Sequence, residues 1–263
     1  MDNRPIGIFD SGIGGLTVLR QIQRLLPGED VVYFGDTARV PYGGKSKSTI
    51  IKFSTENIIF LLEKNVKLVI VACNTSSALA ISYLQKVFSV PILGVIEAGI
   101  NKALEVSLNK KIAVIGTRST IESGAYQGRI MKKNKKAKVY SKSCPLFVPL
   151  VEEGILSGKL VQEAIQMYLK GIKKENIDSI ILGCTHYPLL KNEIASYLKG
   201  INIVDSAKEV AQHTQSILEI NDLLSNNHNA KESYYVSDDP EGFRKLAKLL
   251  LKKAIPKPKR VNV

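Results

Sequence analysis

The stretch VIVACNT, residues 69 to 75, is an apolar run that passes directly into a cysteine and two small polar residues. The stretch IILGCTH, residues 180 to 186, repeats this pattern with its cysteine 111 positions later. Apolar runs of this length are typical of strands buried in parallel sheets. Because ligands bind outside the carboxyl ends of such strands, Cys73 and Cys184 are the first candidates for a ligand site.

A second pair of stretches repeats at almost the same spacing. GIFDSG, residues 7 to 12, and VIGTRST, residues 114 to 120, each run from a strand into small polar residues. Asp10 and Thr117, at equivalent points, are 107 positions apart. Two repeats in register predict two similar α/β halves. With a pseudo-two-fold axis between them, the two thiols would approach one ligand from opposite sides of an interdomain cleft.

Apolar runs and helical stripes alternate along the rest of the chain. Leu16, Leu19, Ile22 and Leu26 share one helical face, and the next residues, Pro27-Gly28, end that helix. Strands alternating with helices predict an α/β fold with mainly parallel sheets covered on both sides. The expected strands are residues 6–9, 31–34, 68–72, 92–95, 112–115, 180–182 and 201–204.

The chain is expected to cross between the two domains twice. Glu97-Ala98-Gly99 is the predicted crossing into the second half, and Asp205-Ser206-Ala207 the predicted crossing back. In the returning segment, the apolar stripe of residues 243–254 predicts an amphipathic helix. The first α/β domain would then comprise residues 1–97 plus 207–263, and the second residues 98–206.

Composition excludes several classes of protein. The 263 residues are 44% hydrophobic and 23% charged, as in ordinary globular chains. No apolar run reaches the roughly 18 residues that a membrane-spanning helix needs. The first residues carry no apolar signal core, and the three cysteines are too few, and odd in number, for a disulfide framework. We therefore expect a cytoplasmic protein with reduced thiols and no membrane partner.

The net charge of +13 is concentrated in two stretches. Residues 129–142 hold seven cations and no acid, and residues 241–263 hold eight cations against one acid, which leaves the remainder balanced. Aromatic residues do not interleave with these cations, and no nucleic-acid-binding module is present. We favour solvated surfaces and expect no nucleic-acid partner. The non-enzymatic alternative is a basic protein that binds nucleic acid or another partner through these lysine-rich stretches.

Several motifs with known chemistry are incomplete. GIGGLT, residues 12 to 17, has Thr17 where the dinucleotide fingerprint needs Gly or Ala, and Arg39 stands where a P-loop ending in Gly44-Lys45-Ser46 needs its first glycine. Cys184 and His186 lack the spacing of a zinc site. A Cys–His hydrolase would leave the repeated cysteine unexplained. Cys144, among apolar neighbours, fits an inert buried thiol.

Two thiols on opposite faces of one ligand suit inversion of a carbon stereocentre. This reaction needs a base on one face and an acid on the other, and a thiol with a pKa near 8.5 can take either role. Asp10 is placed to assist Cys73, and His186 lies on the same side of an extended chain as Cys184. Glu153 could orient or protonate His186. Each of these three also has a structural alternative, as a helix cap, a hydrogen-bonding residue or a surface charge.

With these residues in place, the sequence closely resembles the aspartate/glutamate racemase family over residues 6 to about 260. The most specific segments are FDSGIGGLT (9–17), GDTARVPYG (35–43), ACNT (72–75), CPLFVPLVEEG (144–154) and GCTHYP (183–188). The Asp10-Ser11 and Pro41-Tyr42-Gly43 elements resemble the glutamate racemases of the family. Aspartate racemases, or racemases of a related acid, are the runner-up.

The resemblance implies that L- and D-glutamate are interconverted without pyridoxal phosphate, metal or nucleotide, to supply D-glutamate for peptidoglycan. Cys73 would remove the α-proton of D-glutamate and Cys184 that of L-glutamate. Asp10 would assist Cys73, while His186 and Glu153 would assist Cys184. A homodimer is also implied. The implied substrate-binding residues are Asp10, Ser11, Pro41, Tyr42, Gly43, Cys73, Asn74, Thr75, Thr117, Thr120, Cys184, Thr185 and His186.

Overall fold

Two parallel sheets form the framework of the computed structural model, which describes residues 1–227 and 229–263. Within these residues, the first sheet has the strand order β10-β9-β2-β1-β3-β4 and the second the order β6-β5-β7-β8, with every pairing parallel. The first contains β1 (Ile6–Asp10), β2 (Val31–Gly35), β3 (Leu68–Val71), β4 (Ile92–Gly94), β9 (Glu232–Val236) and β10 (Lys259–Arg260). The second contains β5 (Lys111–Gly116), β6 (Lys138–Ser143), β7 (Ser179–Gly183) and β8 (Asn202–Val204).

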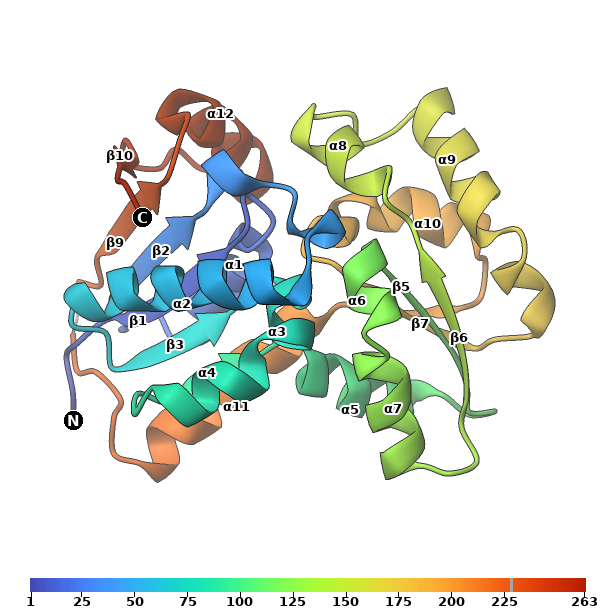
Figure 1. Cartoon of the computed structure of the whole chain (residues 1–263), viewed down its shortest axis with the longest axis horizontal. Coiled ribbons are helices and arrows are strands. Elements are labelled where there is room, and N and C mark those ends of the chain that lie inside the picture. Colours follow the sequence, from blue (N-terminus) through green and yellow to red (C-terminus); the bar gives the residue numbers. More distant parts are fainter. Residues whose placement is uncertain (228) are drawn as a thin grey trace.

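Helices cover both faces of each sheet, and the two halves lie side by side (Figure 1). We call the first sheet with its helices the first lobe and the second sheet with its helices the second lobe. The first lobe includes α1 (Leu16–Leu25), α2 (Lys47–Glu63), α3 (Asn74–Leu79), α4 (Ile81–Val87), α11 (Ser206–Ile220) and α12 (Pro240–Leu251). The second includes α5 (Ile96–Val106), α6 (Arg118–Glu122), α7 (Ala125–Lys133), α8 (Phe147–Glu152), α9 (Lys159–Leu169) and α10 (Lys191–Tyr197). Short 3-10 turns are η1 (Thr37–Arg39), η2 (Tyr42–Gly44), η3 (Ile172–Glu175) and η4 (Tyr187–Leu190).

Strand order confirms the predicted fold class. The central four strands of the first sheet run β2-β1-β3-β4, and those of the second run β6-β5-β7-β8, so β1 corresponds to β5 and β3 to β7. Side chains alternate between the faces of each sheet: Ile8 packs against α1 and α11, whereas Phe9 packs with the core beneath α2. Both cysteines of the repeated pattern therefore follow equivalent strands.

Three strands lie outside the predicted set. β6, with the sequence KVYSKS, is a largely solvent-exposed edge strand, so it lacks the apolar run used to predict the others. β9 returns the chain to the first sheet beside β2, and β10 extends that edge. The predicted tail helix is present as α12, where Asp239 caps the first turn by accepting a hydrogen bond from the amide of Gly242.

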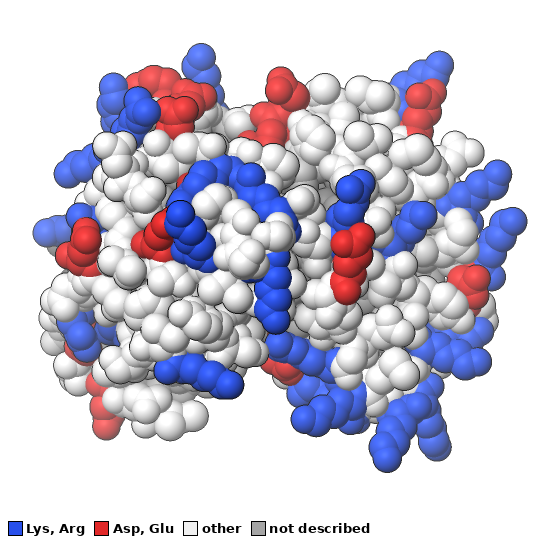
Figure 2. Space-filling view, viewed as in Figure 1, with Lys and Arg blue, Asp and Glu red and all other residues white. Residues whose placement is uncertain are grey.

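The basic stretch before β6 lies on the surface. Lys and Arg side chains gather at the lower end of the second lobe, over α7 and the turn that leads to β6 (Figure 2). Arg129 and Lys133 form ion pairs with Glu97 of α5, at 3.0 and 3.3 Å. In the described part of the chain, no helix is both long and apolar enough to span a membrane.

A buried ion pair fastens the amino-terminal edge of the first lobe. The ammonium group of Lys67 lies 2.6 Å from a carboxylate oxygen of Glu29, and both side chains are almost fully buried. Lys67 also donates hydrogen bonds to the carbonyl oxygens of Asp2 and Leu223, each at 2.6 Å. One side chain thus connects β3 to the start of the chain and to the segment that follows α11.

We expect Lys67→Ala to lower the free energy of unfolding by about 3–5 kcal/mol, because the Glu29 carboxylate is left buried without its partner. The double variant Lys67→Met/Glu29→Leu should recover most of this loss, since it leaves no unpaired charge. Urea denaturation of the two variants and the parent measures both changes. Equal losses in the single and double variants would contradict the assignment.

Candidate active site

Cys73 and Cys184 line the same pocket between the two lobes. Cys73 follows β3 and directly precedes α3, and Cys184 follows β7 at the equivalent edge of the second sheet. The residues that line the pocket are Ser11, Pro41, Tyr42, Gly43, Cys73, Asn74, Thr75, Thr117, Val148, Cys184, Thr185 and His186. All except Val148 belong to the predicted set. The repeated strand endings thus converge on one small volume.

Hydrogen bonds across the interface hold this pocket closed. The hydroxyl of Thr75, in the first lobe, lies 3.0 Å from that of Thr117 and 3.2 Å from that of Thr120, in the second. The side-chain amide of Asn74 donates to the hydroxyl of Tyr126 at 2.8 Å. The remaining cavity measures about 10 Å³, which is the space of about one water molecule. A larger ligand therefore requires the lobes to separate.

Asp10 lies behind the pocket wall, where it joins the lobes. Its carboxylate accepts hydrogen bonds from the amide of Gly12 and the hydroxyl of Thr185, both at 3.1 Å. Burial raises the pKa of Asp10, while the positive charge of His186 and the amides of Gly12 and Gly15 oppose this rise. Asp10 does not cap α1, whose N-cap is Gly15. The structure therefore gives this carboxylate electrostatic neighbours on both lobes.

Cys73 is a buried thiol with a carboxylate nearby. Burial and then the negative charge of Asp10 raise the pKa of Cys73 to about 12, against the amide of Ser76 and the hydroxyl of Ser11. The sulfur lies 3.8 Å from that hydroxyl. At neutral pH the side chain is therefore a protonated thiol that can donate a proton into the pocket.

Cys184 has a different environment, because His186 follows it by two residues. Its sulfur lies 3.8 Å from Nδ1 of His186, and Nε2 of the same ring lies 2.5 Å from a carboxylate oxygen of Glu152. Burial alone would lower the pKa of His186, but hydrogen bonds to Cys184 and Glu152 raise it well above its usual value. A protonated imidazole between a sulfur and a carboxylate is the result.

Glu152, and not the expected Glu153, is the partner of His186. Glu152 is the last residue of α8, four positions after Val148, so both side chains lie on the helix face that borders the pocket. Glu153 is one residue further round, and it is exposed. The expected partner of His186, Glu153, is therefore corrected to Glu152. The sequence pattern does not distinguish the two adjacent acids, and the rotation of α8 decides which of them faces the pocket.

Tyr42 lines the pocket, but its hydroxyl forms hydrogen bonds with residues behind the pocket wall. This hydroxyl donates to the buried carboxylate of Asp36 and accepts a hydrogen bond from Asn57 at 3.1 Å. Asp36 also accepts hydrogen bonds from Arg39 at 2.6 Å and Ser237 at 2.9 Å. The network fixes the loop of residues 41–43 against the first lobe, so the ring and backbone of this loop face the pocket.

Two glycines allow the lobes to approach this closely. A Cβ atom on Gly14 would lie 2.3 Å from the hydroxyl oxygen of Thr185 and 2.8 Å from Nδ1 of His186. A Cβ atom on Gly43 would lie 2.4 Å from Cβ of Thr117. Side chains at either position would force the lobes apart. Gly14 and Gly43 thus let the backbone of the first lobe contact side chains of the second lobe, namely those of Thr185, His186 and Thr117.

The sequence reasoning missed three residues of the site. Val148 comes from α8, Glu152 follows it on the same face, and Tyr126 reaches Asn74 from α7. The first two lie in the stretch FVPLVEE, residues 147–153, where an apolar run ends in two adjacent acids, and this is the signal that the sequence offers for them. Tyr126 has no such signal, because its contact depends on how α7 packs against the second sheet. No cluster of metal-binding side chains occurs in the described ranges, 1–227 and 229–263.

Comparison with known proteins places the chain among racemases. Residues 6–214 match the family described as Asp/Glu/Hydantoin racemase. Glutamate racemase of Aquifex aeolicus is 48% identical over 246 residues, which cover 94% of this chain and 93% of the relative.

Two solved structures of glutamate racemases match the fold over the whole length of the chain. Glutamate racemase of Francisella tularensis, in complex with D-glutamate, has a TM-score of 0.94 and 41% identity, covering 100% of this chain and 98% of that one. The Thermus thermophilus glutamate racemase, in complex with beta-chloro-D-alanine, has a TM-score of 0.90 and 42% identity, covering 100% and 99%.

We expect Glu152→Gln to lower the pKa of His186, because the amide removes the negative charge that stabilises the imidazolium. Glu153→Gln is the matched control and should leave this pKa unchanged. Titration of the His186 ring by NMR measures both. An equal effect of the two substitutions, or an effect of Glu153→Gln alone, would contradict the pairing.

Proposed function

The chain belongs to the Asp/Glu/Hydantoin racemase family, and we propose that it interconverts L- and D-glutamate by proton transfer between two thiols. The observation that carries the proposal is the convergence of Cys73 and Cys184 on one pocket from equivalent strands of two lobes. A base and an acid on opposite faces of one carbon are what inversion requires. Near-complete coverage by glutamate racemases supports the choice of substrate.

The proposed reaction moves one proton at each face of the α-carbon. With L-glutamate, the thiolate of Cys184 takes the α-proton, and the electron pair of the broken C–H bond passes into the α-carboxylate. The thiol of Cys73 then donates its proton to the opposite face, which leaves D-glutamate, a Cys73 thiolate and a Cys184 thiol. With D-glutamate the same steps run in reverse.

The neighbours of the thiols suit these opposite roles. His186, held by Glu152, places a positive charge beside Cys184, which stabilises negative charge on that sulfur. Asp10 and burial favour the protonated form of Cys73. We therefore assign Glu152, in place of Glu153, with His186 as the pair that assists Cys184, and Asp10 as the residue that assists Cys73.

Polar groups of the closed interface are proposed to bind the substrate carboxylates and ammonium. Thr75, Thr117 and Thr120 hydrogen-bond to one another, so their donors can be transferred to a carboxylate when the lobes admit glutamate. Donors aimed at the α-carboxylate stabilise the charge that develops there during proton removal. Closure over the substrate excludes water and strengthens these contacts.

The proposal keeps the other expectations of the family resemblance. The reaction uses no pyridoxal phosphate, metal or nucleotide, and its product is D-glutamate for peptidoglycan. The protein works as a homodimer in the cytoplasm. Sedimentation of the purified protein measures whether it is a dimer.

Purified protein, dialysed against a chelator and treated with hydroxylamine to remove any pyridoxal phosphate, should convert L-glutamate to a racemic mixture. Chiral chromatography after incubation with L-glutamate and, separately, L-aspartate gives the result. Faster racemisation of aspartate would favour the runner-up activity, and loss of activity on chelation or hydroxylamine treatment would contradict cofactor independence.

Cys73→Ser and Cys184→Ser should each lower racemisation by about 10²–10⁴-fold, because one face of the α-carbon loses its acid or base. In deuterium oxide, Cys73→Ser should still exchange the α-proton of L-glutamate through Cys184. Cys184→Ser should exchange that of D-glutamate through Cys73. Proton NMR of each enantiomer measures the exchange.

Cys144→Ala is the control for loss of a thiol, because Cys144 is buried in the core of the second lobe and does not line the pocket. Its racemisation rate should stay close to that of the parent. Full activity in both Cys73→Ser and Cys184→Ser, or the same preferred enantiomer in both exchange experiments, would contradict the two-thiol mechanism.

A further inference from the structure

One edge of the second sheet lies far from the thiol pocket. Because every strand pair of this sheet is parallel, the amino ends of β5, β6, β7 and β8 lie along the same edge. Backbone hydrogen bonds join the turns that precede these strands: the amide of Lys138 donates to the carbonyl oxygen of Lys110, and the amide of Asn202 to that of Asp178. The thiol pocket lies at the opposite, carboxyl ends of the strands. β5 has six residues, so the two ends are about 20 Å apart.

The turns along this edge bring together lysines from distant parts of the sequence. We call residues 107–110, 132–138, 173–178 and 199 the basic edge. Its side chains include those that gather at the lower end of the second lobe in Figure 2. The exposed lysines of the basic edge are Lys132, Lys133, Lys135, Lys136, Lys138, Lys173, Lys174 and Lys199. The lysine-rich stretch seen in the sequence is thus only one part of a larger cationic surface.

Few acids balance this charge. The acids within the basic edge are Glu175 and Asp178. Among the residues that the structure describes, Lys133 is the one lysine of this set that forms an ion pair within 4.0 Å, with Glu97. The other lysines therefore remain available to an anionic partner.

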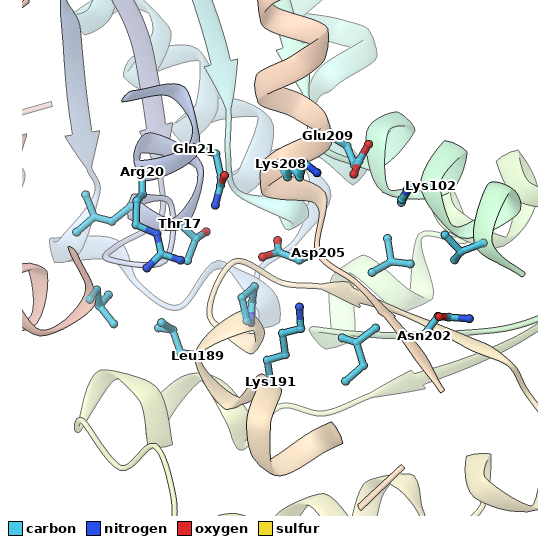
Figure 3. A pocket seen from close by; sticks show the side chains of 16 residues that line it. Thr17, Arg20, Gln21, Lys102, Leu189, Lys191, Asn202, Asp205, Lys208 and Glu209 are labelled. Carbon is cyan, nitrogen blue, oxygen red and sulfur yellow. The ribbon is translucent and has the colours of Figure 1, made fainter. Parts of the chain in front are cut away.

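A second group of cations, in the cavity between the lobes, forms a different kind of surface. Arg20, Lys191 and Lys208 lie there together with the acids Asp205 and Glu209 (Figure 3). These side chains line a concave space of about 440 Å³, which is too small for a macromolecule or a membrane. The basic edge consists of exposed turns, so a large and flat partner can contact lysines of several turns at once.

An exposed leucine lies beside these lysines. Leu108, in the turn between α5 and β5, is 91% exposed. The carboxylate of Asp178 accepts hydrogen bonds from the amides of Leu108 and Asn109, at 2.6 and 2.7 Å. It also accepts one from the hydroxyl of Ser107, at 2.6 Å. These hydrogen bonds hold the turn in one conformation, which keeps an apolar side chain at the surface next to the cations.

The apolar side chains of this region favour a membrane over a nucleic acid. Proteins that bind single-stranded nucleic acid stack its bases on aromatic rings, and proteins that read a duplex place a helix or a β-ribbon in a groove. In the described part of the chain, the exposed large apolar side chains here are Leu108 and, in the last turn of α7, Met131, and both are aliphatic. An anionic membrane increases the partition of a protein by about fivefold for each lysine near its surface, and its interface accepts aliphatic side chains.

We propose that the basic edge docks on a membrane surface rich in anionic phospholipid, with its lysines against the headgroups and Leu108 inserted between them. The thiol pocket, at the other end of the strands, then faces away from the lipid. We expected no membrane partner because the sequence has no apolar run long enough to span a bilayer, and peripheral docking needs no such run. The docking goes beyond the proposed function and does not depend on it.

Co-sedimentation with vesicles tests the docking. The protein should bind vesicles of phosphatidylcholine that contain about one third phosphatidylglycerol, and it should not bind vesicles of phosphatidylcholine alone. Raising the salt from about 0.1 M to about 0.5 M should weaken binding at least tenfold, because salt screens the attraction between exposed charges. Equal binding to the two kinds of vesicle, or binding to neither, would overturn the proposal.

The triple variant Lys132→Ala/Lys135→Ala/Lys136→Ala tests whether the basic edge makes the contact. All three side chains are exposed, so the fold is retained. Binding to the anionic vesicles should weaken by at least about tenfold, since each lysine contributes about fivefold.

Arg244→Ala/Lys245→Ala/Lys248→Ala is the matched control. It removes the same charge from exposed positions of α12, in the first lobe. This variant should bind the vesicles as the parent does. An equal loss in the two triple variants would show that net charge alone attracts the protein, and would overturn the assignment to the basic edge.

A tryptophan at position 108 tests insertion directly, because the chain contains no tryptophan of its own. In Leu108→Trp, anionic vesicles should shift the fluorescence to shorter wavelength, and brominated phospholipid should quench it. Leu249→Trp is the control, since Leu249 is 54% exposed on α12 and should show neither change. Vesicle binding without a shift in Leu108→Trp, or with an equal shift in both variants, would overturn the proposed orientation.

A DNA duplex, added at a phosphate concentration equal to that of the anionic lipid, decides between the two kinds of partner. The protein should stay on the vesicles. Its displacement by the duplex would assign the basic edge to nucleic acid and overturn the membrane proposal. If the protein does not racemise glutamate, the proposed function fails, while the vesicle experiments still decide whether the basic edge docks.

Discussion

The hydrogen bond that Thr185 donates to Asp10 joins the two lobes at the point where both sheets end. Near it, the positive imidazole of His186 interacts with two carboxylates. Its Nε2 lies 2.5 Å from Glu152, and its charge opposes the rise that burial causes in the pKa of Asp10. In a buried pocket these charges are stable only when they remain together. Thr185 and His186 can approach the first lobe this closely only because residue 14 is a glycine, since any side chain there would displace them.

The fold is repeated, yet the chemistry at its two strand ends is not. Equivalent strands, β3 and β7, present a cysteine at the same place in each sheet. Cys73 then has a serine hydroxyl and a buried carboxylate as neighbours, whereas Cys184 has a histidine. The repeated strand pattern accounts for the presence of both thiols at one pocket, one from each lobe. The residues around the two thiols have diverged: burial and Asp10 raise the pKa of Cys73, whereas His186, whose own pKa is raised, lies beside Cys184.

Much of this arrangement could be predicted from the sequence, because buried parallel strands leave a strong local signal. Apolar runs that end in Cys73 and Cys184 predicted both the strands and their meeting point. The exposed edge strand β6 leaves no such signal, since half of its side chains face solvent. The choice of Glu152 over Glu153 depends on the rotation of α8, and the partner of Asn74, Tyr126, depends on how distant helices pack. Such contacts become visible only when the lobes are assembled.

The central claim is that one α-carbon lies between two sulfurs supplied by different lobes. A crystal structure of the protein with D-glutamate bound measures this most directly. We predict that Sγ of Cys73 and Sγ of Cys184 lie on opposite faces of the α-carbon, each at about 3–3.5 Å, the separation expected of reacting atoms. A ligand whose α-carbon contacts only one sulfur, or has both sulfurs on the same face, would contradict it.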